Sequence, residues 1–243
     1  PAVGFCALIA VLGLAIPLGV LVMWLFRASP AYAEGGLVFE LAYALNSIGV
    51  AAAAAVGSVL LALPIAYLAA RSNSWLGSLP ERATYVGYAM PGVVLGLALI
   101  FLGLKYVNSL YKTVGLLVFA YIVRFIPQAV GTVESSILQV DPKHGEAARS
   151  MGDSPLRSFR RATLPQISPG VIAGAALVFL TTMKELPATL LLRPLGFETF
   201  VTYIWQVQEQ GYYGQAAVPA LILVAVSALS MLIILKGDQY DVT

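Results

Sequence analysis

The stretch that decides the fold is polar and lies in an otherwise apolar chain: Glu146-Ala147-Ala148-Arg149-Ser150-Met151-Gly152, followed further on by Leu164-Pro165. It belongs to an insert, residues 139–168, that is rich in basic side chains. On both sides of the insert the chain is almost entirely apolar. We therefore expect the insert to lie in water and the flanking segments to lie in lipid.

Composition restricts the chain to the membrane. Of its 243 residues, 59% are hydrophobic and 11% are charged, and the mean hydropathy is +0.85. A soluble domain carries about 25% charged residues, so this chain could not cover a water-facing surface. The net charge of +2 is too small to indicate binding to nucleic acid. A single histidine, His144, excludes a histidine metal cluster.

Six apolar stretches are long enough to cross a bilayer, which takes about 20 residues. They predict an all-α integral membrane protein with about six transmembrane helices in a single domain over residues 1–243. The predicted spans are about 3–26, 44–70, 84–104, 113–138, 169–192 and 216–235. We expect kinks at the prolines inside spans, which are Pro64, Pro91, Pro127 and Pro187. Two GxxxG pairs predict close helix contacts: Gly92 with Gly96, and Gly170 with Gly174.

Basic residues set the predicted orientation, because cytoplasmic loops are enriched in Lys and Arg. If the insert is cytoplasmic, both termini of this segment are cytoplasmic as well. That side then gathers eight basic residues: Arg71, Arg82, Lys143, Arg149, Arg157, Arg160, Arg161 and Lys236. The opposite side has four: Arg27, Lys105, Lys112 and Arg193.

Local signals predict two short helices in the insert. Asp141 is a suitable N-cap before Pro142, and Gly152 is a suitable residue just beyond the C-terminus of the first helix. Ser154 and Pro155 repeat the start signal for a second helix, which we expect to stop before Pro165. Arg157 and Arg161 are four residues apart and share one face of it, available to anionic headgroups or to a protein partner.

The spacing of Glu146-Ala147-Ala148, Gly152 and Leu164-Pro165 resembles the cytoplasmic coupling loop of permease subunits of bacterial ABC importers. One position departs from the pattern, because Ala162 stands where an apolar isoleucine is usual. The resemblance implies a location in the bacterial inner membrane and an ATPase partner. The residues that it places at the ATPase are Glu146, Ala147, Ala148, Gly152, Leu156, Phe159, Leu164 and Pro165.

The ATP chemistry is expected in a separate chain. The sequence holds no GxxxxGK[ST] motif to cradle phosphates, so ATP and Mg would be bound by a cytoplasmic ATPase dimer. With one histidine, no Ser-His-Asp set can form, and we find no catalytic residues. The chain is therefore predicted to be a transport subunit without a cofactor of its own, rather than an enzyme.

Three of the charged residues within the predicted spans stand out: Arg124, Lys184 and Glu185. Charges in a bilayer are costly and point to function. Arg124 precedes Asp141 by 17 residues and Glu185 follows Pro169 by 16. At about 1.5 Å per residue, both lie about 24–26 Å from the insert's end of the membrane. We therefore expect Arg124 and Glu185 either to form a structural ion pair or to line the translocation path.

The segment Thr182-Met183-Lys184-Glu185-Leu186-Pro187-Ala188-Thr189-Leu190-Leu191-Leu192-Arg193-Pro194, with Gly196-Phe197-Glu198-Thr199, resembles the membrane subunit of ferric-iron ABC importers. The segments Tyr88-Ala89-Met90-Pro91-Gly92 and Val123-Arg124-Phe125-Ile126-Pro127 are similar to that family too. The resemblance implies a type I importer fold, MetI-like, and Fe(III) delivered by a periplasmic substrate-binding protein. Members often carry two six-span halves, so the chain is expected to be a C-terminal half that needs a second half or subunit.

Several alternatives stay open. The same machine could carry thiamine, sulfate, molybdate or a polyamine, and a less favoured alternative is an ion-coupled secondary transporter. Fe(III) prefers oxygen ligands, but the spans are poor in carboxylates and no stable metal site is predicted. The outward loop 193–215 has helical apolar spacing, and Glu198 and Glu209 in it are candidate charges for docking the binding protein.

Overall fold

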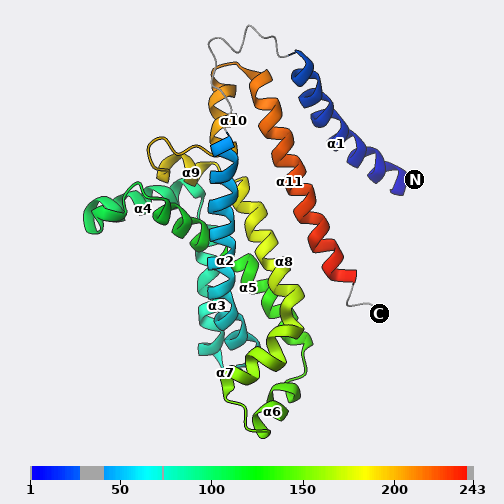
Figure 1. Cartoon of the computed structure of the whole chain (residues 1–243), viewed down its shortest axis with the longest axis vertical. Coiled ribbons are helices and arrows are strands. Elements are labelled where there is room, and N and C mark those ends of the chain that lie inside the picture. The colour runs from blue at the N-terminus through cyan, green and yellow to red at the C-terminus, as the bar shows by residue number, and fades with distance from the viewer. Residues whose placement is uncertain (1, 28–40, 73, 240–243) are drawn as a thin grey trace. The chain divides into compact units, whose positions relative to one another are not determined.

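The structure is a computed structural model. It describes residues 2–27, 41–72 and 74–239, with side chains as far as residue 232, so the side chain of Lys236 and most of the first predicted loop lie outside it. The described residues form helices (Figure 1). The long ones are α1 (Ala2–Arg27), α2 (Leu41–Arg71), α3 (Trp75–Ala89), α4 (Gly92–Tyr106), α5 (Val114–Gln139), α8 (Leu164–Met183) and α11 (Tyr213–Gln239). The short ones are η2 (Asn108–Leu110), α6 (Lys143–Ser150), α7 (Pro155–Ser158), the π-helical η3 (Phe159–Thr163), α9 (Pro187–Leu192) and α10 (Phe200–Glu209).

Internal contacts divide the chain into two compact units. The smaller unit comprises residues 1–47 and 197–228, and the larger unit comprises residues 48–196 and 229–243. Five helices among the described residues are long and apolar enough to cross a membrane, and α3 with α4 would make a sixth. The predicted spans 3–26, 44–70, 113–138 and 216–235 correspond to α1, α2, α5 and α11. The other two predicted spans differ from the structure.

The predicted span 84–104 is two helices with a sharp bend between them. α3 begins at Trp75, where the Ser74 side chain accepts a hydrogen bond from the Gly77 N–H, so Arg82 lies in a helix and not in the predicted loop. α3 and α4 meet at an angle of 102°. Pro91 causes the break, because it forces the preceding Met90 into an extended conformation (φ −73°, ψ 131°). Figure 1 shows α4 turning away from α3 at this point.

The predicted span 169–192 is also wrong in its bounds. The helical path starts at Pro155, passes through η3 into α8 and ends at Met183. A short break follows before α9, because Pro187 in the first turn of α9 cannot continue the preceding helix. The second helix of the insert therefore does not stop before Pro165 as predicted. The wider π turn of η3 carries the chain into α8, and Pro165 lies in the first turn of α8, where a missing N–H is tolerated.

The core of the larger unit lies where α5 and α8 pack together. A Cβ atom at Gly170 would collide with the Ser136 side chain and lie 2.8 Å from the Thr132 carbonyl oxygen. A Cβ at Gly174 would collide with the Thr132 hydroxyl. The close contact predicted from this GxxxG pair is thus confirmed, and the missing side chains let the two backbones approach.

In the smaller unit, α10 is fixed at its start by a capping box between Thr199 and Thr202. The Glu198 carboxylate accepts hydrogen bonds from the Thr202 hydroxyl at 2.8 Å and from the Gln206 amide at 3.0 Å. This side chain is therefore engaged within α10, which limits the docking role predicted for it. Glu209, at the other end of α10, is exposed.

Candidate functional site

The insert is attached firmly to the ends of α2 and α5. The Arg71 guanidinium, at the end of α2, donates to the carbonyl oxygens of Val140 at 2.8 Å and Ile137 at 3.2 Å, which terminate α5. Tyr67 and Phe159 pack edge to face with ring centroids 5.6 Å apart. These contacts join the start of the insert and its π-helical segment to α2.

α6 begins at Lys143 with Pro142 as its N-cap, one residue later than predicted, whereas Gly152 ends it as predicted. The Asp141 carboxylate accepts a hydrogen bond from the Lys143 N–H at 2.9 Å. At the other end, Gly152 has a φ of +97°, and the N–H groups of Gly152 and Asp153 donate to the carbonyls of Arg149 and Ala148. This is a Schellman arrangement, which glycine adopts without strain. The chain can therefore turn sharply after α6.

The residues that resemble the coupling loop do not all face outward. Glu146, Ala147, Gly152, Leu156 and Pro165 are exposed. Ala148 is buried, Phe159 packs on Tyr67, and Leu164 is half-buried, so these three stabilise the insert itself. Met151, which the loop pattern does not include, is 83% exposed beside Gly152. Its position, an apolar residue between Ser150 and Gly152 in a polar insert, is the sequence signal that could have indicated an exposed contact residue.

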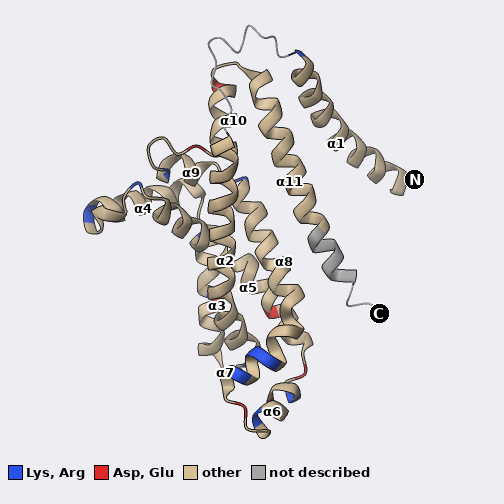
Figure 2. Cartoon of the chain, viewed as in Figure 1, with Lys and Arg blue, Asp and Glu red and all other residues tan. Residues whose placement is uncertain are grey.

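The charges of the larger unit gather on the insert, as the blue and red segments around α6 and α7 in Figure 2 show. Asp153 pairs with both Arg157 and Arg161, each at 3.7 Å. Both arginine side chains are mostly exposed, so these pairs contribute little to stability. They do hold the two arginines on one side of the helix.

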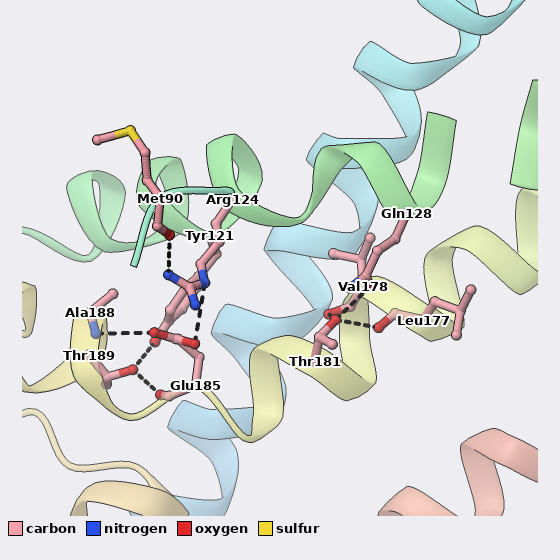
Figure 3. A network of polar contacts seen from close by, with 10 residues as sticks. All are labelled: Met90, Tyr121, Arg124, Gln128, Leu177, Val178, Thr181, Glu185, Ala188 and Thr189. Atoms are coloured by element: carbon pink, nitrogen blue, oxygen red, sulfur yellow. Dashed lines mark hydrogen bonds and ion pairs between the residues drawn. The ribbon is translucent and has the colours of Figure 1, made fainter. Parts of the chain in front are cut away.

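The structure brings Arg124 and Glu185 together. The Arg124 Nε lies 3.6 Å from Glu185 Oε2, and the side chains are 20% and 9% exposed. The Arg124 Nη1 donates to the Met90 carbonyl oxygen at 3.0 Å. The other carboxylate oxygen of Glu185 accepts from the Ala188 N–H at 3.2 Å (Figure 3). Lys184, the third charge predicted in a span, is exposed at the end of α8 and stands apart from this pair.

Two further polar side chains lie on the same face of α5 as Arg124: Tyr121 joins this network, and Gln128 forms a separate contact with α8. The hydroxyls of Tyr121 and Thr189 share a hydrogen bond of 2.6 Å, and Thr189 also donates to the Glu185 carbonyl (Figure 3). The Gln128 side-chain oxygen accepts from the Thr181 hydroxyl at 2.8 Å. Tyr121, Arg124 and Gln128 follow a 3–4 spacing that places them on one face, a signal which sequence analysis did not use.

No group of three His, Cys, Asp or Glu side chains lies close enough to hold a metal ion within the part of the chain that the structure describes. The polar groups of this unit instead form two sets: the exposed charges of the insert, and the Arg124–Glu185 pair with its bonds to Met90 and Ala188.

Comparison with known proteins places the chain in a family. Residues 62–236 match the family described as the binding-protein-dependent transport system inner membrane component. This match covers most of the chain and includes both the insert and the Arg124–Glu185 pair. The chain therefore belongs to this family and is a multi-pass inner membrane protein.

Two curated relatives and one solved structure are similar to this chain over most of its length. The Fe(3+)-transport system permease protein FbpB 2 of Haemophilus influenzae is 34% identical over 96% of this chain, and the chain spans 46% of that protein. A probable molybdenum ABC transporter permease of Haloferax volcanii is 30% identical, with 90% of this chain and 83% of that protein covered. A bacterial alginate ABC transporter solved with its periplasmic protein has a TM-score of 0.67 at 16% identity, covering 98% of this chain and 92% of that chain. The predicted type I importer fold is confirmed.

Proposed function

We propose that this chain forms half of the pore of an ATP-driven importer that passes Fe(III), delivered by a periplasmic binding protein, across the inner membrane. The observation that carries the cargo assignment is the 34% identity to a ferric permease over 96% of the chain, which extends through both the insert and the segment 182–194. The spans offer few carboxylates, so high-affinity recognition of the ion is left to the binding protein.

The insert is proposed to be the cytoplasmic coupling loop. Glu146 and Ala147 are exposed on α6 and Met151 is exposed at its tip, so a cytoplasmic ATPase dimer, which would bind ATP and Mg, can reach all three. Arg71 and Tyr67 would carry the motion to α2 and α5. With the insert in the cytoplasm, both termini of this segment lie on the same side.

A second six-helix half or subunit is proposed to complete the pathway. The chain spans 46% of its ferric relative, which leaves room for such a half in one longer protein. Large apolar side chains are also exposed on α4, including Leu97 at 54%, Phe101 at 59% and Leu104 at 55%. The lipid bilayer and the second half would cover these side chains.

A second cargo is supported by the molybdenum relative, which is 30% identical over 90% of the chain. The coupling loop would serve an oxyanion importer equally well, so cargo must be measured directly. Membership of the binding-protein-dependent family disfavours the ion-coupled secondary transporter.

The experiment reconstitutes the full complex in proteoliposomes, with the binding protein outside and ATP inside. Radiolabelled ferric ion and molybdate are offered separately. ATP-dependent uptake of ferric ion alone supports the proposal, uptake of molybdate alone replaces the cargo, and uptake that ignores ATP contradicts the importer assignment.

The Glu146→Lys variant tests the coupling loop in the same vesicles. We expect ATP-dependent uptake to fall about 100-fold or more, because the lysine would place an unpaired charge of the wrong sign in the proposed interface with the ATPase. Lys143→Gln, which alters another exposed charge of α6, is the control and should keep most of the uptake. Normal uptake by Glu146→Lys would exclude Glu146 from the ATPase contact.

A further inference from the structure

Two spans of the larger unit are broken inside the apolar region. The first break lies at Met90 and Pro91, between α3 and α4, and the second lies between Met183 and Pro187, before α9. A break leaves backbone groups without helical partners, and such groups are costly in lipid unless another group bonds to them. The Met90 carbonyl and the Ala188 N–H are two such groups.

The Arg124–Glu185 pair satisfies both groups at once. Arg124 donates to the Met90 carbonyl at the first break, and Glu185 accepts from the Ala188 N–H at the second. The ion pair of 3.6 Å then joins the two breaks (Figure 3). Both carboxylate oxygens of Glu185 are thus engaged within the protein, and the residue is 7% exposed, which leaves little of it to bind a passing ion.

The helices that follow the two breaks also pack against each other. A Cβ atom at Gly92 would lie 2.5 Å from Glu185 Oε1 and 2.8 Å from Arg124 Nη1. One turn further along α4, a Cβ at Gly96 would lie 2.8 Å from Leu191 Cδ1 of α9. The predicted close contact of this GxxxG pair is therefore the seam between α4 and α9, with the ion pair at one end of it.

The continuous helix α5 supplies the fixed side of this arrangement. It contributes Arg124 to the pair and Tyr121 to the hydrogen bond with Thr189 of α9, and it runs unbroken through Pro127. α5 also packs closely on α8 through Gly170 and Gly174. Thus α4 and α9 are both held to a helix that is itself held in the core.

We propose that Arg124 and Glu185 form a clamp that fastens α4 and α9 to α5 as one unit, so that the two broken spans move together during transport. The clamp positions helices and does not bind cargo. The joint movement of the two spans rests on the proposed transport function, whereas the contacts that fasten α4 and α9 to α5 do not depend on cargo or ATP.

The first test is hydrogen-exchange mass spectrometry on the complete transporter in lipid nanodiscs, without cargo or nucleotide. Gly92→Ala keeps both charges but pushes a methyl group between them, and Gly103→Ala, whose Cβ would meet Tyr111 at an ordinary 3.4 Å, is the control on the same helix. We expect Gly92→Ala to raise exchange at least about tenfold in both 90–96 and 186–190, since a broken buried pair leaves two charges uncompensated. A rise confined to one of the two segments would overturn the clamp.

The second test is a double-mutant cycle with Arg124→Gln, Glu185→Gln and both together, which does not depend on Gly92→Ala folding. Each single variant should lower the cargo imported per ATP hydrolysed at least about tenfold, and the double variant should recover part of that loss, because no charge is left alone. Uptake lost with exchange unchanged in 90–96 and 186–190 would assign the pair to cargo binding and overturn the clamp. The hydrogen-exchange experiment contains no cargo, so its result tests the clamp even if the transporter carries an ion other than Fe(III). Failure of the clamp can therefore be distinguished from failure of the proposed cargo.

Discussion

The insert and the clamp are two polar regions of one apolar unit, and they use their polar groups in opposite ways. In the insert, hydrogen bonds through Asp141, Arg71 and Ser158 fix the backbone, and the charged side chains of α6 remain in water. In the clamp, Glu185 is buried and Arg124 is half-buried, and both side chains are bonded to the backbone at two helix breaks. Charges in the insert are therefore available to a partner, whereas charges in the clamp hold the protein together.

The largest expected effect is a difference in the free energy of unfolding between a variant of the clamp and a variant of the insert. Glu185→Ala leaves Arg124 without its partner, which we expect to lower the free energy of unfolding by about 3 kcal/mol. Glu146→Ala removes an exposed carboxylate and should change it by less than about 0.5 kcal/mol. Denaturant or thermal unfolding of the purified permease in detergent measures both. Equal losses of stability would mean that the charges of the clamp contribute no more to folding than the charges of the insert.

A second prediction concerns the seam that anchors the clamp to the core. Gly170→Ala places a methyl group against Ser136 and the Thr132 carbonyl, so α5 and α8 must separate, and we expect a loss of about 1–3 kcal/mol. Gly131→Ala, on α5 with only the Tyr85 hydroxyl at 4.0 Å, is the matched control. The comparison is read from the same unfolding curves. If both variants melt together, close packing at Gly170 is not what joins the two helices.

These two regions also differ in how far the sequence predicts them. The two ends of α6 are specified by neighbours in the chain: the Asp141 carboxylate bonds to the Lys143 N–H at its start, and Gly152 ends the helix. Such signals act within one or two helical turns, so reading them from the sequence succeeds. The exception is the end of the second helix: Pro165 predicts a stop, but the helix continues through η3 into α8 and Pro165 lies in the first turn of α8.

The clamp depends on residues that are distant in the chain, and only part of it could be predicted. Equal depth in the membrane indicates that Arg124 and Glu185 could meet. A kink is predicted at Pro91, but nothing in the sequence of 84–104 distinguishes a kink from the observed bend of 102°. Pro64 and Pro127 lie inside helices that continue, so a proline alone does not distinguish a kink from a break. The difference is that Arg124 reaches Met90 and satisfies the freed carbonyl there.

The smallest effect tests the insert's own backbone. Gly152→Ala puts a side chain on a residue with a φ of +97°, which costs about 1–2 kcal/mol although the space around it is open. Because the strain is local, we expect faster hydrogen exchange and easier proteolysis within 143–153 and no change at 90–96, where the clamp lies. Coupling of ATP hydrolysis to uptake should weaken, since a frayed α6 presents Glu146 and Met151 less rigidly to the ATPase. If Gly152→Ala loosened the clamp as well, the insert and the clamp would share one cooperative unit, and the independence of the water-facing and buried polar regions would fail.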